Sequence, residues 1–268
     1  MLQISACIEM LFRELPFGDR FKAAAEAGFQ GVEFWGWTNK DLSAVKEGLA
    51  ESALPLAACS IGTRDKETAA AFADGCLLKR ENAPVFREII AESIEVVRSL
   101  GGRTLIVTTG NTLPDVPRYV QHDAILTNLF AAAGLLEQAG VTLVLEPLNI
   151  LCDHKGYYLS RSDEAFSILR TVDSPNIKLL FDVYHQQITE GFLTENIRGN
   201  IGSIGHFHIG DVPGRHQPGT GEIRYAHIFR AIAASGYKGY VGCEYTPAEG
   251  TDSLAASKAA LELAAAVS

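Results

Sequence analysis

The strongest constraint on the fold is a regular alternation of short apolar runs with longer amphipathic stretches along the 268-residue sequence. The apolar runs have the length of strands, and the amphipathic stretches have the length of helices. Eight such pairs, joined mostly by short turns, predict an α/β protein built as a closed (β/α)₈ barrel. The strands read as continuous apolar runs, as expected where helices cover a parallel sheet.

The expected strands cover residues 3–8, 31–34, 56–61, 104–108, 141–146, 177–182, 204–209 and 240–244. The expected helices cover residues 17–27, 41–52, 84–100, 119–139, 162–172, 193–199, 225–234 and 253–267. Residues 64–80 are less regular, and we interpret them as a long loop that covers the strand ends. No Gly-x-Gly-x-x-Gly motif follows the first strand, which disfavours an open doubly wound sheet. Because no linker or charge block divides the chain, we expect a single domain over residues 1–268.

Composition argues against several classes of partner. The formal net charge of −9 is unfavourable for a surface that binds nucleic acid or an anionic membrane. The sequence shows neither a secretory signal nor an uncharged apolar run of the ~18 residues that a spanning helix needs. Its five cysteines are scattered without a Cys-x-x-Cys pair, which suits reduced thiols. We therefore expect a cytoplasmic protein that acts on a small molecule.

Four potential metal ligands stand at the C-terminal ends of four successive expected strands. They are Glu146, Asp182, His208 and Glu244, separated by 36, 26 and 36 residues. Each interval is close to one strand–helix repeat, so the four side chains are expected around one rim of the barrel. Three carboxylates and one imidazole form an oxygen-rich set that suits one Mn²⁺, Mg²⁺ or Co²⁺ ion, and Zn²⁺ is also compatible with it.

Each of these residues also has a simpler explanation. An acid after a strand often caps the next helix, and a single histidine near a barrel end is more often structural than functional. Four such groups on successive strands favour the metal site. His206 points the same way along the strand as His208, so either histidine could be the ligand. His208 is preferred because it lies nearer the glycine-rich loop that follows the strand.

Four motifs resemble those of a known family. LEPLN (Glu146), FDVYH (Asp182), HFHIGDVPGRHQPGTGEI (His208) and CEY (Glu244) are similar to the xylose-isomerase-like TIM-barrel superfamily. Within it, the chain resembles the hydroxypyruvate isomerase family and the related ketose 3-epimerases over nearly its whole length. The PGTGEI loop resembles the hydroxypyruvate isomerases in particular. Several of those isomerases carry an amide side chain where this chain has His208, whereas the epimerases carry histidine.

The resemblance implies a single divalent metal ion bound by Glu146, Asp182, His208 and Glu244. It also implies that Glu146 and Glu244 are the catalytic acid and base, and that the protein forms a homodimer or homotetramer. A metal ion chelated by a carbonyl and its neighbouring hydroxyl acidifies the C–H bond between them, and a carboxylate can take that proton.

The carbon to which the proton returns, and the face from which it arrives, decide the reaction. Its return to the adjacent carbon, through an enediolate, converts hydroxypyruvate into tartronate semialdehyde, which is the leading prediction. Its return to the same carbon from the opposite face gives a ketose 3-epimerase of the D-tagatose, D-allulose or L-ribulose type. The same residues serve both outcomes.

Further residues are candidate substrate contacts. The guanidinium of Arg215 suits a substrate oxygen or carboxylate, although a solvated loop arginine is a comparable reading. His185 would reach a substrate hydroxyl or pair with a nearby acid. Glu222 would orient a ligand or the loop, or begin a helix. Trp35 would wall an apolar side of the pocket or pack against its neighbours. Glu33 is expected to brace the site rather than to catalyse.

Two function classes remain as alternatives. A metal-dependent phosphodiesterase is suggested by apurinic endonucleases of the same broad fold, but that chemistry needs more histidines at the strand ends and a groove that attracts phosphate. A non-catalytic barrel that carries or senses a sugar would tolerate loss of a base, whereas both Glu146 and Glu244 are present.

Overall fold

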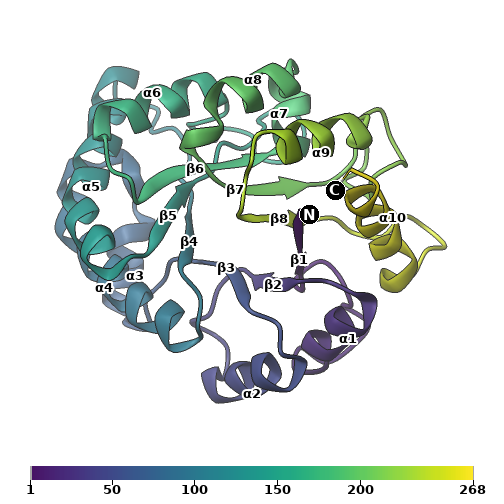
Figure 1. The fold of residues 1–268 in the computed structure, drawn as a ribbon. Helices are drawn as coiled ribbons and strands as arrows, with labels where there is room; N and C mark the ends of the chain where they lie inside the picture. Colours follow the sequence, from purple (N-terminus) through teal and green to yellow (C-terminus); the bar gives the residue numbers. More distant parts are fainter. Residues whose placement is uncertain (1, 268) are drawn as a thin grey trace.

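A closed ring of eight parallel strands forms the centre of the computed structural model, which describes residues 2–267 (Figure 1). The strands follow one another around the ring in sequence order, and the last pairs with the first. They are β1 (Gln3–Cys7), β2 (Gly31–Phe34), β3 (Leu56–Ser60), β4 (Thr104–Val107), β5 (Thr142–Leu145), β6 (Ile177–Asp182), β7 (Ile204–Ile209) and β8 (Tyr240–Cys243). The expected (β/α)₈ barrel is confirmed.

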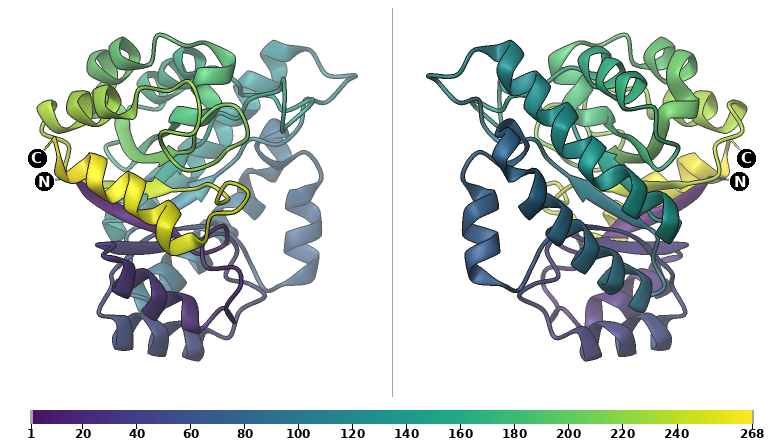
Figure 2. Two further views of the ribbon diagram at one scale, coloured as in Figure 1. Left: turned by 90° about the vertical axis from the view of Figure 1, so that its right-hand side faces the viewer. Right: turned by 90° about the vertical axis from the view of Figure 1, so that its left-hand side faces the viewer.

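Helices surround the ring on its outer face (Figures 1 and 2). The α-helices are α1 (Asp19–Ala27), α2 (Leu42–Ser52), α3 (Lys66–Ala73), α4 (Ala83–Ser99), α5 (Arg118–Ala139), α6 (Ser162–Val172), α7 (Val183–Thr189), α8 (Leu193–Asn200), α9 (Tyr225–Ala234) and α10 (Ser253–Ala265). Three short 3₁₀ helices are η1 (Cys76–Leu78), η2 (Arg80–Asn82) and η3 (Ile201–Ser203). None of the helices in residues 2–267 is both long and apolar enough to cross a membrane.

The expectation of a loop over residues 64–80 is wrong. This segment forms α3 followed by η1 and η2. The side chain of Asp65 caps α3 by accepting a hydrogen bond from the Thr68 backbone N–H at 2.8 Å. None of the residues of α3 is fully buried, so the helix lacks the apolar stripe by which a helix is recognised in a sequence. Helix α3 lies at the end of the barrel where the long loops after the strands gather (Figure 2).

The buried apolar residues form two layers. The larger one packs the helices onto the outside of the strands. The smaller one consists of Ala58, Ile106, Val144 and Leu180, one residue from each of β3 to β6. Because side chains alternate between the faces of a strand, this second cluster is the inner layer on one side of the barrel. The buried polar residues Ser5 of β1, Glu33 of β2 and His206 of β7 contact one another on the other side of the barrel.

Candidate active site

The four expected metal ligands come together at the C-terminal end of the barrel. One ligand atom from each of Glu146, Asp182, His208 and Glu244 lies within 4.8 Å of the other three, and all four residues are buried. The strand register places Asp182 of β6 directly beside His208 of β7. Glu146 and Glu244 are the first residues after β5 and β8. The barrel topology therefore brings together residues that are far apart in the sequence.

The arrangement fits a divalent metal ion. Nδ1 of His208 lies 3.4 Å from Oε1 of Glu146 and 3.2 Å from Oε2 of Glu244. This nitrogen is buried and has no hydrogen-bond partner among residues 2–267. A buried polar atom without a partner is costly, and so is a group of neighbouring carboxylates. A cation between them would satisfy the nitrogen and offset the repulsion, and three carboxylates with one imidazole suit a hard or borderline ion.

Asp182 acts as a helix cap and as a member of the cluster. Its Oδ1 accepts hydrogen bonds from the backbone N–H groups of Tyr184 at 2.8 Å and His185 at 3.3 Å, which starts α7. Its Oδ2 faces the cluster and lies 3.4 Å from Nη2 of Arg215. Capping and metal binding are therefore compatible for this residue, because each uses a different oxygen.

The charged groups of the cluster shift one another's pKa values. Burial by itself disfavours the ionised form of Glu244, but His208 and Arg215 outweigh it and hold the pKa of Glu244 well below its ordinary value. Burial also opposes the charged form of His208, yet Glu244 and Glu33 raise its pKa well above the usual value. Arg215 forms an ion pair with Glu244, and its Nε also donates to the Glu244 carbonyl at 3.3 Å. The Glu244 carboxylate therefore already attracts the positive charge of Arg215.

The glycine-rich loop that delivers Arg215 is folded around Asp211. The Asp211 carboxylate accepts hydrogen bonds from four backbone N–H groups, those of Val212, Gly219, Gly221 and Ile223, at 2.8–3.1 Å. A Cβ at position 221 would lie 2.0 Å from the carbonyl oxygen of Val212. The PGTGEI motif is therefore explained by close approach of the backbone, which places Arg215 over the cluster.

His185 presents its Nε2 to the pocket beside Asp182. Its Nδ1 accepts a hydrogen bond from the Asn149 backbone N–H at 3.3 Å, and the Asn149 side-chain Nδ2 lies 2.7 Å from the same atom. Burial and the nearby Arg215 lower the pKa of His185 to about 3, so the ring is neutral and its hydrogen is on Nε2. That atom is buried without a hydrogen-bond partner among the described residues, and it lies 3.5 Å from Oδ2 of Asp182, the nearby acid with which the sequence allowed it to pair. It can donate to a substrate oxygen.

A cavity of about 450 Å³ opens over the cluster. Its lining includes Trp35, Phe72, Cys76, His154, His185 and Arg215, together with Glu146, His208 and Glu244. Glu222 is placed elsewhere: its side chain is exposed and accepts a hydrogen bond from Gln187 Nε2 at 3.0 Å. His154, Asn149 and Phe72 were not singled out from the sequence. The position of His154 and Asn149 in the loop after the fifth strand is the signal that could have found those two.

Comparison with known proteins places this site in a family. The family model for the xylose isomerase-like TIM barrel matches residues 21–266. The chain belongs to this family. It is 35% identical to hydroxypyruvate isomerase of Escherichia coli (strain K12) over 252 residues, which cover 94% of this chain and 96% of that one. It is 34% identical to 2-oxo-tetronate isomerase of Cupriavidus necator over 251 residues, covering 94% and 95% of the two chains.

A solved structure shows the same fold. The crystal structure of AP endonuclease, family 2, from Brucella melitensis superposes with a TM-score of 0.86 at 32% identity, covering 95% of this chain and 96% of that one. The curated relatives named above are isomerases. The family member described here is accordingly an isomerase, and the expected resemblance to the hydroxypyruvate isomerases is confirmed.

Proposed function

We propose that this protein isomerises a short 2-oxo acid with a hydroxyl group on C3, with hydroxypyruvate as the leading substrate. Glu146, Asp182, His208 and Glu244 would hold one divalent metal ion, and Glu146 and Glu244 would act as base and acid. The observation that carries the proposal is the buried group of four ligands, three of which, Glu146, His208 and Glu244, line one cavity. Relatives named hydroxypyruvate isomerase and 2-oxo-tetronate isomerase support the substrate class.

The proposed role of each residue follows from its position in the barrel. When bound, the divalent ion supplies Lewis acidity toward the carbonyl and hydroxyl oxygens of the substrate. Glu146 and Glu244 follow β5 and β8, so their carboxylates reach the substrate from different sides. One carboxylate removes a proton from C3 and a proton returns to C2, while the hydroxyl proton moves from the C3 oxygen to the C2 oxygen. No redox partner is needed, because the substrate and the product are isomers.

Other groups bind and orient the acid. His185 donates its Nε2 hydrogen to a substrate oxygen, and Trp35 forms one wall of the cavity. The guanidinium of Arg215 suits the substrate carboxylate, because it presents two parallel N–H donors. It is drawn toward Glu244 in the structure and would be shared between that residue and the substrate. The cavity has room for a three- or four-carbon acid.

The test is incubation of the Mn²⁺- or Mg²⁺-loaded protein in D₂O with hydroxypyruvate and, separately, with 2-oxo-tetronate, followed by NMR. Formation of the isomer with its carbonyl at C3, an aldehyde from hydroxypyruvate and a ketone from 2-oxo-tetronate, with deuterium at C2, is the expected result for at least one acid. Absence of turnover and of deuterium incorporation for both acids would overturn the proposal.

A ketose 3-epimerase is the second candidate, because the histidine at position 208 is the residue found in the sugar epimerases. A parallel incubation with D-tagatose, D-allulose and L-ribulose distinguishes the two. Deuterium at C3 together with the C3 epimer would move the assignment to epimerisation. Nicking of abasic DNA with Zn²⁺ would favour the phosphodiesterase alternative, which the net charge of −9 disfavours. Tight sugar binding without proton exchange would favour a binding protein.

A further inference from the structure

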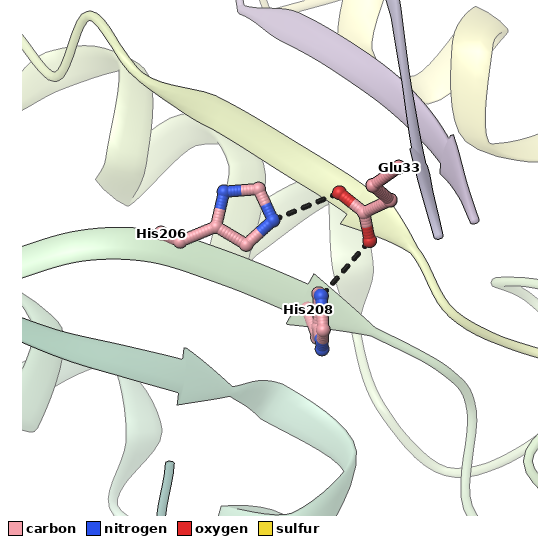
Figure 3. A group of neighbouring side chains, drawn as sticks. All are labelled: Glu33, His206 and His208. Atoms are coloured by element: carbon pink, nitrogen blue, oxygen red, sulfur yellow. Dashed lines mark hydrogen bonds and ion pairs between the residues drawn. The ribbon is translucent and has the colours of Figure 1, made fainter. Parts of the chain in front are cut away.

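A buried carboxylate lies directly behind the candidate metal centre and takes no part in the proton transfer described above. Glu33 of β2 is 2% exposed, and its two oxygens face the two histidines of β7 (Figure 3). Oε2 lies 2.9 Å from Nε2 of His206 and accepts a hydrogen bond from the Ser5 hydroxyl at 2.8 Å. Oε1 lies 2.9 Å from Nε2 of His208. One carboxylate thus serves both histidines.

This 2.9 Å contact is an ion pair rather than an aligned hydrogen bond, because neither Oε1 of Glu33 nor Nε2 of His208 has a hydrogen-bond partner among residues 2–267. The negative charge of Glu33 nevertheless bears on the orientation of the His208 ring. An ionised carboxylate can only accept hydrogen bonds, so the nitrogen that faces it, Nε2, carries the hydrogen. In the neutral ring the lone pair is then on Nδ1, the atom that faces Glu146 and Glu244. Histidines that bind metal ions usually donate their other N–H to a carboxylate, a carbonyl or water in this way. His206 faces the other oxygen of Glu33, so the two histidines do not compete for the same carboxylate oxygen.

Strand β8 leaves the space that Glu33 needs. Gly242 pairs in register with His208, and a Cβ at position 242 would lie 2.3 Å from Oε1 of Glu33. The carboxylate therefore crosses the inside of the barrel over a position without a side chain.

We infer that Glu33 is a positioning residue that turns Nδ1 of His208 toward the metal centre, while His206 and Ser5 hold Glu33 in place through its other oxygen. The inference rests on the metal centre of the proposed function, but not on its substrate or its proton transfer. A protein that binds Mn²⁺ and turns over none of the tested substrates would remove the proposed reaction and leave this inference standing.

The first test is the Mn²⁺ affinity of the purified metal-free protein, measured by calorimetry. Glu33→Gln keeps the size of the side chain but removes the charge that fixes both rings, and we expect its Kd for Mn²⁺ to rise about 10–100-fold. His206→Gln is the matched control: its side-chain amide can still donate to Oε2 of Glu33 and hold it in place, so its Kd should rise less than about threefold. Unchanged affinity in Glu33→Gln would overturn the inference. So would two Mn²⁺ ions per wild-type chain with one lost in Glu33→Gln, because Glu33 would then itself be a ligand.

A second measurement uses the wild-type protein and so does not depend on the folding of a variant. In the Mg²⁺-loaded, ¹⁵N-histidine-labelled protein, NMR should show the His208 hydrogen on Nε2, exchanging slowly with water because it is buried against the carboxylate of Glu33. Binding of the ion through Nδ1 leaves the hydrogen on Nε2, so this measurement tests the orientation of the ring, and the calorimetry tests the contribution of Glu33 to it. Detection of the hydrogen on Nδ1 would overturn the inference.

Discussion

The indole Nε1 of Trp35 donates a hydrogen bond to Oε1 of Glu244 at 2.7 Å, although the two residues are 209 positions apart in the sequence. The other oxygen, Oε2, lies 3.2 Å from Nδ1 of His208 and pairs with Arg215. The two oxygens of this carboxylate therefore have different surroundings. Trp35 is 44% exposed at the mouth of the cavity, so it has a polar role beyond that of an apolar wall.

Replacing this tryptophan should separate its two roles. Trp35→Phe keeps an aromatic wall but removes the donor, and we expect kcat to fall about tenfold, since a hydrogen bond to a charged group contributes ~1.5 kcal/mol. KM should change little. Trp35→Ala removes the wall as well and should also raise KM. Steady-state kinetics of both variants check this, and equal kinetic constants for Trp35→Phe and the wild type would contradict it.

The two proposed bases should be essential for turnover but not for folding. Glu146→Gln and Glu244→Gln retain the size of the side chain and lose the basic oxygen, so kcat should fall by a factor of about 10²–10⁴ or more. Circular dichroism should show that both variants keep the barrel. Glu222→Gln is a suitable control, because Glu222 is exposed and contacts Gln187. Near-wild-type activity of both glutamine variants would remove the proposed mechanism.

Metal binding should stabilise the fold, because the ion would relieve repulsion among buried carboxylates. Mn²⁺ at one hundred times its Kd should add about 2.7 kcal/mol to the free energy of unfolding. For a protein of this size that corresponds to a rise in Tm of about 5–10 °C, which EDTA should reverse together with activity. Differential scanning calorimetry measures the shift. Asp182→Asn should show a smaller one, and an identical Tm with and without Mn²⁺ would argue against the site.

Two glycines of the Arg215 loop should respond differently to substitution by alanine. Gly219 has φ +94° and open space around it, so Gly219→Ala should cost about 1–2 kcal/mol of backbone strain. Gly221→Ala would place a methyl group 2.0 Å from the Val212 carbonyl oxygen, which the loop cannot accommodate without moving. We expect it to lower kcat/KM at least tenfold more than Gly219→Ala, because Arg215 loses its position. Equal kinetic effects of the two variants would show that the loop adapts.

The sequence allowed the barrel and the group of four residues to be predicted, because both follow from spacing. Intervals close to one strand–helix repeat place Glu146, Asp182, His208 and Glu244 on neighbouring strands whatever the details of packing. Helix α7 was not expected, since its start depends on the Asp182 side chain rather than on an apolar pattern. Helix α3 was missed because it buries none of its residues fully.

Contacts between residues that are far apart in the sequence could not be predicted from it. The pairing of Trp35 with Glu244 and the two histidine contacts of Glu33 depend on side-chain directions inside the closed ring. The choice between His206 and His208 as a ligand depended on the same information. The structure places His208 both with the three carboxylates and with Glu33, whereas His206 belongs to the Glu33 group alone. The position of Glu222 outside the cavity likewise depends on how the loop folds around Asp211.

The missing side chain at position 242 has a consequence for protein engineering. A transplant of Glu146, Asp182, His208 and Glu244 into another barrel would reproduce the ligands. It would not reproduce the space behind them, which the Glu33 carboxylate occupies. A recipient with any side chain at the position of Gly242 would push the carboxylate of Glu33 away from His208. A designer would therefore have to move glutamate and glycine together, as a matched pair on two different strands, before the four ligands could be expected to recover their orientation.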